Sequence, residues 1–178
     1  RAKTILRILR KTFKVPRRLA ADRDAFETLV ATIISQNTTD RNAAKTFEKL
    51  SKRFEIRPEV LANAEVSQIE ECLKTAGLYK NKAKSIKQVS ETLLEKYGGN
   101  LNIILSLPFE EARKTLMQFP GVGAKTADVI LLFSAKQNTI PVDTHVNRVS
   151  KRLHLAPMHE KPENVRTALQ ALYRPADY

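Results

Sequence analysis

Apolar side chains recur at helical spacing along this chain, and this period constrains the fold more than any other feature of the sequence. In DAFETLVATIIS, residues 24–35, they occupy positions i, i+3, i+4, i+7 and i+8 of one helix face, as Phe26, Leu29, Val30, Ile33 and Ile34. Asp24 precedes Glu27 by three residues, which is typical of a helix start because the aspartate oxygen can accept from an unpaired backbone amide. The segment is therefore predicted to be an amphipathic helix that begins at Asp24.

The same period recurs in residues 3–13, 66–77, 83–100 and 108–119. In the first of these stretches Ile8 and Leu9 lie among basic residues. The third is closed by Gly98, and the last is predicted to start with Pro108 at its first helical position and to run to Phe119. No stretch shows sustained strand alternation between hairpin turns. The fold class is predicted to be all-α, with about nine or ten short helices.

The turn FPGVGAK, residues 119–125, is the strongest functional signal in the sequence. Gly121 and Gly123 permit positive φ and close approach of another chain segment. With a helix beginning near Ala124, the amides of Val122, Gly123, Ala124 and Lys125 are predicted to point outward and to form an anion site. The alternative is an ordinary helix–helix hairpin that uses glycine for tight packing. Because 31 Lys and Arg residues against 19 Asp and Glu give a net charge of +12, a nucleic-acid phosphate is the favoured interpretation.

Lys125 and Asp143 form a candidate catalytic pair. The positive end of a helix dipole disfavours an ammonium ion, and a neutral amine is a nucleophile suited to Schiff-base chemistry. The alternative for Lys125 is a lysine that only binds phosphate. Asp143, in TIPVDTHVNRVSKRL, precedes a predicted helix, so the alternative for it is an N-cap. An amine beside a carboxylate is the pairing expected for attack at a sugar C1′, where the acid takes the amine proton or stabilises positive charge.

The single cysteine, Cys72, excludes a disulfide within the chain and a cage of cysteine ligands for a metal. This composition fits a reducing compartment. No apolar run approaches the roughly 20 residues that span a bilayer, and no signal peptide is visible. The sequence is therefore expected to act inside a cell and away from the membrane.

Four segments resemble the helix–hairpin–helix DNA glycosylases, and most closely endonuclease III. They are FPGVGAKTADVIL, IPVDTHVNRVSKRL, IISQNTTDRNAAKTF and AGLYKNKAKSI, in compatible order within residues 1–172. The resemblance implies a two-lobed helical fold with a DNA-binding cleft between the lobes. Residues 20–132 would form a six-helix lobe that includes the hairpin, and residues 1–19 with 133–178 would form the second lobe.

The resemblance also implies a mechanism and a set of site residues. The protein would be a bifunctional glycosylase and abasic-site lyase that removes oxidised pyrimidines from duplex DNA, with Lys125 as nucleophile and Asp143 as its acidic partner. The DNA-binding residues would be Gln36, Asn37, Lys80, Lys82, Gly121, Val122, Gly123, His145 and Arg148. Two alternatives stay open: a monofunctional mismatch or uracil-type glycosylase, and a helix–hairpin–helix DNA-binding module without catalysis.

Several of these assignments carry alternatives of their own. The wedge that fills the place of a flipped base falls at Asn37 by spacing, with Gln36 just before it. Lys80 and Lys82 could instead belong to a solvated basic loop, and His145 could serve in packing or capping. The expected partner is double-stranded DNA with a damaged base or an abasic site, bound by a monomer in the nucleoid of a prokaryote or the nucleus of a eukaryote.

The sequence departs from the family at its cofactor. Most endonuclease III proteins end in four cysteines that hold a [4Fe–4S] cluster, whereas this sequence stops at Tyr178, about where that loop would begin. Either the sequence is truncated or it belongs to a cluster-free branch. No cofactor and no metal are predicted for the residues given.

Overall fold

Helices make up the ordered elements of the protein, and the computed structural model describes residues 1–13 and 23–177. In that part of the chain no strand is present, which confirms the all-α prediction, and eleven α-helices replace the nine or ten expected. They are α1 (Ala2–Thr12), α2 (Ala25–Ser35), α3 (Asp40–Arg53), α4 (Pro58–Asn63), α5 (Val66–Leu73), α6 (Tyr79–Tyr97), α7 (Asn102–Leu105), α8 (Phe109–Leu116), α9 (Ala124–Phe133), α10 (Thr144–Arg152) and α11 (Pro162–Leu172), followed by a 3₁₀ turn at Pro175–Asp177.

Helix α2 lies at the centre of the larger hydrophobic core. All five side chains of its predicted face are buried, and Leu29 and Ile34 expose no surface. Asp24 accepts a hydrogen bond from the amide of Glu27 at 2.7 Å, so the predicted cap is confirmed. Burial of each such leucine or isoleucine contributes about 1.5–3 kcal/mol to folding, so this helix is fixed mainly by its packing.

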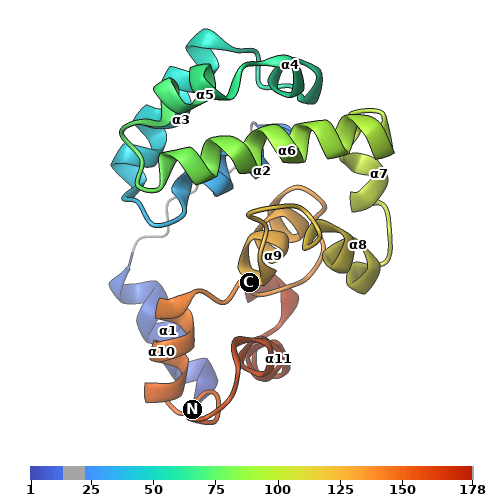
Figure 1. Cartoon of the computed structure of the whole chain (residues 1–178). Helices are drawn as coiled ribbons and strands as arrows, with labels where there is room; N and C mark the ends of the chain where they lie inside the picture. Colours follow the sequence, from blue (N-terminus) through green and yellow to red (C-terminus); the bar gives the residue numbers. More distant parts are fainter. Residues whose placement is uncertain (14–22, 178) are drawn as a thin grey trace.

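Helix α6 covers one side of this core and packs against α2, α4 and α5 (Figure 1). It is closed by Gly98, as predicted, and Gly98 has a left-handed φ of 57°. The prediction for α8 was less accurate, because Pro108 is the N-cap rather than the first helical residue and the helix ends at Leu116. The last residues of that predicted segment, up to Phe119, form the turn into the hairpin.

A second, smaller core joins α10 and α11 and contains Val142, Ala156, Val165 and Leu169. Figure 1 shows α1 in the same lower part of the molecule as these two helices, far from α4 and α5. No α1 residue is fully buried, and its predicted apolar face is largely exposed, at 55% for Ile8 and 40% for Leu9. Helix α1 instead meets the chain end through polar contacts, including an ion pair of 2.9 Å between Arg10 and Asp177.

The lobe boundaries stay a prediction. The boundary at residues 19–20 lies outside the described residues, and the one at 132–133 coincides with the end of α9. No described helix has the combination of length and apolarity that a membrane span requires.

Candidate active site and nucleic-acid interface

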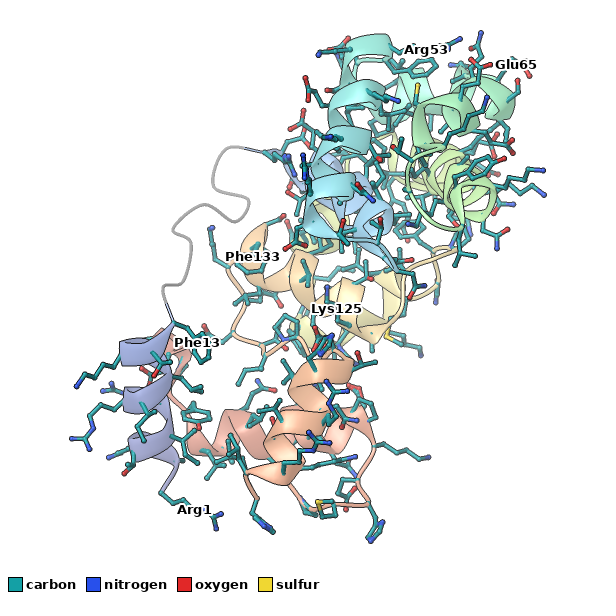
Figure 2. All side chains as sticks on the ribbon, turned by 90° about the vertical axis from the view of Figure 1, so that its left-hand side faces the viewer. Arg1, Phe13, Arg53, Glu65, Lys125 and Phe133 are labelled. Atoms are coloured by element: carbon teal, nitrogen blue, oxygen red, sulfur yellow. The ribbon has the colours of Figure 1, made fainter. Side chains whose placement is uncertain are left out.

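An open cavity of about 1270 Å³ lies where three chain segments meet, and it holds most of the predicted site residues. The segments are the turn after α2, the hairpin before α9 and the start of α10. Lys125 and Asp143, which are 18 positions apart in the sequence, both line it. Figure 2 shows Lys125 between the helices of the larger core and the α10–α11 part of the chain. Other lining residues include Gln36, Asn37, Gly121, Val122, Gly123 and His145.

The hairpin uses its two glycines differently. Gly121 has a φ of 79°, and a Cβ at this position would lie 2.8 Å from Ser85 Oγ on α6. Gly123 has a φ of −91° and nothing within 4 Å of its hypothetical Cβ, so neither the positive φ nor the close approach that a glycine permits is used there. Gly121 therefore provides both the reversal of the chain and the close packing against α6.

Three amides, rather than the predicted four, are available at the start of α9. The amide of Val122 donates to Phe119 O at 3.0 Å, so it does not point outward. The amides of Gly123, Ala124 and Lys125 donate to no group in the part of the chain that the structure describes. Amides at a helix start attract anions because the helix dipole adds to their partial positive charge.

Lys125 and Asp143 are close enough to share a cavity but do not form an ion pair. Lys125 is exposed in the first turn of α9, and its ammonium has no partner among residues 1–13 and 23–177. Asp143 is half-buried and caps α10, since its Oδ1 accepts from the Val146 amide at 2.7 Å. Its Oδ2 makes no hydrogen bond to a described residue. The capping role is therefore present, and one carboxylate oxygen stays available to a ligand or an amine.

The two wedge candidates differ in what they contact. Gln36 donates from Nε2 to Gly121 O at 2.8 Å and to Thr126 Oγ1 at 3.3 Å. Asn37 is exposed, has a left-handed φ of 50°, and lines the same cavity. Gln36 thus ties the turn after α2 to the hairpin, whereas the Asn37 side chain is free to meet a ligand.

Lys80 and Lys82 lie in very different surroundings. Lys80 is exposed, as a phosphate contact requires, but Lys82 is only 3% exposed and donates to Ile34 O at 2.9 Å. Burial lowers the pKa of Lys82. The prediction of a phosphate contact at Lys82 conflicts with this burial: the side chain satisfies a carbonyl at the C-terminal end of α2 instead. Helical spacing contains the signal, because residue 82 precedes the buried Ile86 by four positions.

His145 and Arg148 lie on the exposed side of α10. Arg148 Nη2 is 3.1 Å from His145 Nδ1, and His145 lines the cavity. The cap position at the start of α10 is occupied by Asp143, and His145 is exposed rather than packed. Both side chains are therefore free to meet a ligand that spans the start of α10.

Sequence reasoning missed a buried ion pair between Arg113 on α8 and Asp128 on α9. Asp128 is only 2% exposed, in a helix that is otherwise mostly apolar. A carboxylate inside such a run is the available signal, since a buried charge requires a partner. The identity of that partner depends on tertiary structure.

The residues present do not fit the iron–sulfur cluster that most endonuclease III proteins hold. Such a cluster takes four cysteine thiolates, and the sequence contains only Cys72, which is buried. No group of three or more potential metal ligands occurs within the described ranges.

Comparison with known proteins identifies relatives of this chain. Residues 30–175 match the model of the HhH-GPD superfamily of base excision DNA repair proteins. Endonuclease III of Thermotoga maritima is 36% identical over 84% of this chain and 65% of its own length. Endonuclease III of Sulfolobus acidocaldarius is 37% identical over 74% of this chain and 57% of its own length. The chain thus spans about three fifths of the length of these two relatives.

Two solved structures extend the similarity to the fold. A trapped covalent intermediate of endonuclease III with DNA has a TM-score of 0.85 and 29% identity, and the match covers 100% of this chain and 81% of that one. A non-covalent complex of endonuclease III with DNA has a TM-score of 0.84 and 30% identity, with coverage of 99% and 78%.

Proposed function

Because the chain belongs to the HhH-GPD superfamily of base excision DNA repair proteins, we propose that it is a bifunctional DNA glycosylase and abasic-site lyase. The observation that carries the proposal is one cavity lined by both Lys125 and Asp143, beside the amides of Gly123, Ala124 and Lys125. Neither the Lys125 amine nor Asp143 Oδ2 has a partner among the residues that the structure describes. A module that only binds phosphate needs neither the acid nor this spacing between acid and amine.

The chemistry assigns one step to each group. A base flipped into the cavity would bring the sugar C1′ to Lys125. The neutral amine attacks C1′, the N-glycosidic bond breaks, and its electron pair leaves with the base, which takes up a proton. Asp143 accepts the amine proton through Oδ2. The sugar opens to a Schiff base, and loss of a 2′ proton then expels the 3′ phosphate by β-elimination.

Other residues would bind the DNA around this centre. The amides of Gly123, Ala124 and Lys125 would hold a phosphate at the start of α9, and Lys80 would add a charge contact. Asn37 is the proposed wedge because it is exposed at the cavity, whereas Gln36 is tied to the hairpin.

The substrate and setting complete the proposal. The resemblance to endonuclease III implies oxidised pyrimidines as the bases removed. The protein would act as a monomer on double-stranded DNA, wherever the chromosomal DNA of its cell lies.

Borohydride trapping tests the proposed nucleophile. The protein is incubated with a duplex that holds one oxidised pyrimidine, or one abasic site, and any Schiff base is reduced to a stable adduct. Wild type is expected to give the adduct and Lys125→Gln to give none. Lys96→Gln serves as the matched control, because Lys96 is exposed on α6 and does not line the cavity.

Each other outcome would indicate a different mechanism or class of protein. An adduct of equal yield in Lys125→Gln would remove that residue from the mechanism. Base release without any adduct would identify a monofunctional glycosylase. Tight DNA binding without base release or adduct would identify a DNA-binding module.

A further inference from the structure

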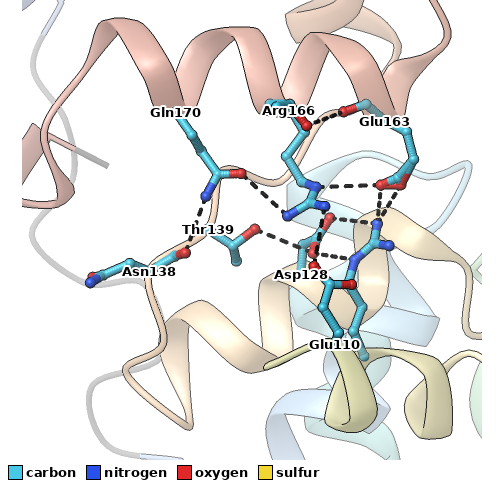
Figure 3. Close-up of polar contacts among 9 residues, drawn as sticks. Glu110, Asp128, Asn138, Thr139, Glu163, Arg166 and Gln170 are labelled. Atoms are coloured by element: carbon cyan, nitrogen blue, oxygen red, sulfur yellow. Dashed lines mark hydrogen bonds and ion pairs between the residues drawn. The ribbon is translucent and has the colours of Figure 1, made fainter. Parts of the chain in front are cut away.

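A buried ionic network joins α8, α9 and α11 (Figure 3). Arg113 on α8 donates from Nε to Asp128 Oδ1 at 2.8 Å and from Nη2 to Asp128 Oδ2 at 3.2 Å. Its Nη2 also donates to Glu163 on α11, at 2.9 Å for Oε2. Arg113 is 8% exposed and Asp128 is 2% exposed. Two consecutive helices, α8 and α9, are therefore joined to the more distant α11 through one guanidinium.

Asp128 has a second connection, to the segment that carries Asp143. Thr139 exposes no surface and donates from Oγ1 to Asp128 Oδ1 at 3.3 Å. Asp143 follows Thr139 by four residues in a stretch without helix or strand, and Lys125 precedes Asp128 by three residues on α9. One carboxylate thus links the helix that bears the amine to the segment that bears the acid.

An outer ring of contacts holds the same segment to α11. Arg166 Nη1 donates to Gln170 Oε1 at 3.2 Å, and Gln170 Nε2 donates to Asn138 O at 3.3 Å. Arg166 also lies over the ring of Phe109, 5.3 Å from its centroid, and forms an ion pair of 3.4 Å with Glu163. Figure 3 shows Arg166 and Gln170 on the α11 side of Asp128. The stretch before Asp143 is consequently held from two sides.

The charges of the network depend on one another. Burial by itself opposes the charge on Arg113, but the hydrogen bonds and charges of Asp128 and Glu163 outweigh it and raise the pKa of that guanidinium. If Arg113 lost its charge, Asp128 would stay as a buried carboxylate without its bidentate partner, which is a strongly unfavourable state. Both α9 and the segment after Thr139 would then be free to shift.

We propose that Asp128 is a positioning residue that fixes Lys125 and Asp143 relative to each other, through its bidentate pair with Arg113 and its hydrogen bond from Thr139. This inference rests on the proposed function for the roles of Lys125 and Asp143, but its geometry can be tested separately. Misplacement of reacting groups by about 1 Å can lower a rate by about 100-fold. The network therefore acts on the rate of the bound complex rather than on DNA affinity.

The test compares three variants of the full chain with a matched control. The variants are Asp128→Asn, Arg113→Gln and the double variant that carries both changes. Ile69→Ala is the control. Ile69 is fully buried in α5 and does not line the cavity, so its truncation should destabilise the larger core without changing the site. All four are measured well below their unfolding midpoints. The readouts are affinity for abasic-site DNA, the single-turnover rate of adduct formation at saturating protein, and hydrogen exchange of residues 120–128 and 139–147.

Asp128→Asn and Arg113→Gln are expected to lower the saturated rate by about 10- to 100-fold while affinity changes by less than about threefold. Exchange should rise in both segments. The double variant should exceed Arg113→Gln alone in rate by at least about twofold, because no buried charge is left without its partner. Ile69→Ala should keep a rate near that of wild type and unchanged exchange in both segments.

The proposal is overturned if Asp128→Asn keeps wild-type exchange in both segments, or if Ile69→Ala changes rate and exchange as much as the network variants do. If wild type binds DNA but gives no adduct, the proposed function fails. The exchange comparison then decides by itself whether Asp128 fixes the two segments.

Discussion

The hairpin geometry makes Gly121→Ala the sharpest test of how the anion site is built. The new Cβ would sit 2.8 Å from Ser85 Oγ and 3.0 Å from Ser85 Cβ, at a φ of 79°. The left-handed backbone costs an alanine about 1–2 kcal/mol, and overpacking costs about 1–3 kcal/mol. Reduced freedom of the unfolded chain offsets about 0.4–1 kcal/mol. The expected loss is therefore about 1–5 kcal/mol in the free energy of unfolding.

A companion variant separates the two contributions. Ser85→Gly deletes both atoms that the new Cβ would meet, at an intrinsic loss of about 0.5 kcal/mol in the α6 interior. The double variant Gly121→Ala with Ser85→Gly should keep only the backbone strain. The loss of stability in the double variant should therefore be smaller than the sum of the two single losses by about 1–3 kcal/mol.

Urea unfolding and DNA binding measure the consequences. Gly121 O accepts the hydrogen bond from Gln36, so a displaced hairpin would also loosen the turn after α2. Affinity should fall for damaged and undamaged duplexes alike, because the hairpin amides are proposed to contact phosphate, and phosphate contacts do not depend on the bases. Gly121→Ala with stability within 0.5 kcal/mol of wild type, or a double variant that recovers nothing, would refute the steric reasoning.

Three further outcomes follow from the site. Asp143→Asn keeps the cap on α10, so stability should fall by at most about 1 kcal/mol, whereas single-turnover excision should drop by orders of magnitude with affinity level or higher; normal excision would leave Asp143 as a cap only. Lys80→Gln should flatten the slope of log affinity against log salt by about one unit, and Lys82→Met should leave it unchanged, since Lys82 is buried. The stability of wild type relative to Lys82→Met should rise as pH rises from the lowered pKa of folded Lys82 toward 10.5, because the unfolded chain binds the proton more strongly in that window. Urea unfolding at several pH values measures this difference in stability, and a difference that does not change with pH would contradict the prediction.

The helices that the sequence predicted well are those whose information is local. Helix α2 has five apolar residues on one face and its own cap in Asp24, and α6 has a glycine stop at Gly98. Period and caps are encoded within a few turns, so tertiary contacts need only agree with them. Helix α1 has the same kind of period, yet Ile8 and Leu9 are exposed. A pattern identifies a face that can be buried, and a packing partner decides whether it is.

The site was predictable where a motif fixes backbone geometry and unpredictable where two distant segments must meet. The hairpin placed the start of α9 at Ala124 correctly. The burial of Lys82 could be predicted only by applying the helical period of α6 to a charged residue. The partners of Arg113 lie 15 and 50 positions away in the chain, a separation for which periodicity has no signal.

The choice between Gln36 and Asn37 illustrates why spacing alone could not decide. Both follow α2 directly, and both are polar amides of similar chemistry. The difference arises because Gln36 reaches the hairpin, 85 positions further along, and is held there by Gly121 O. The next residue turns into the left-handed region at a φ of 50°, which leaves its side chain exposed at the cavity. An asparagine tolerates that backbone better than most residues do, so the local strain and the free amide coincide at Asn37.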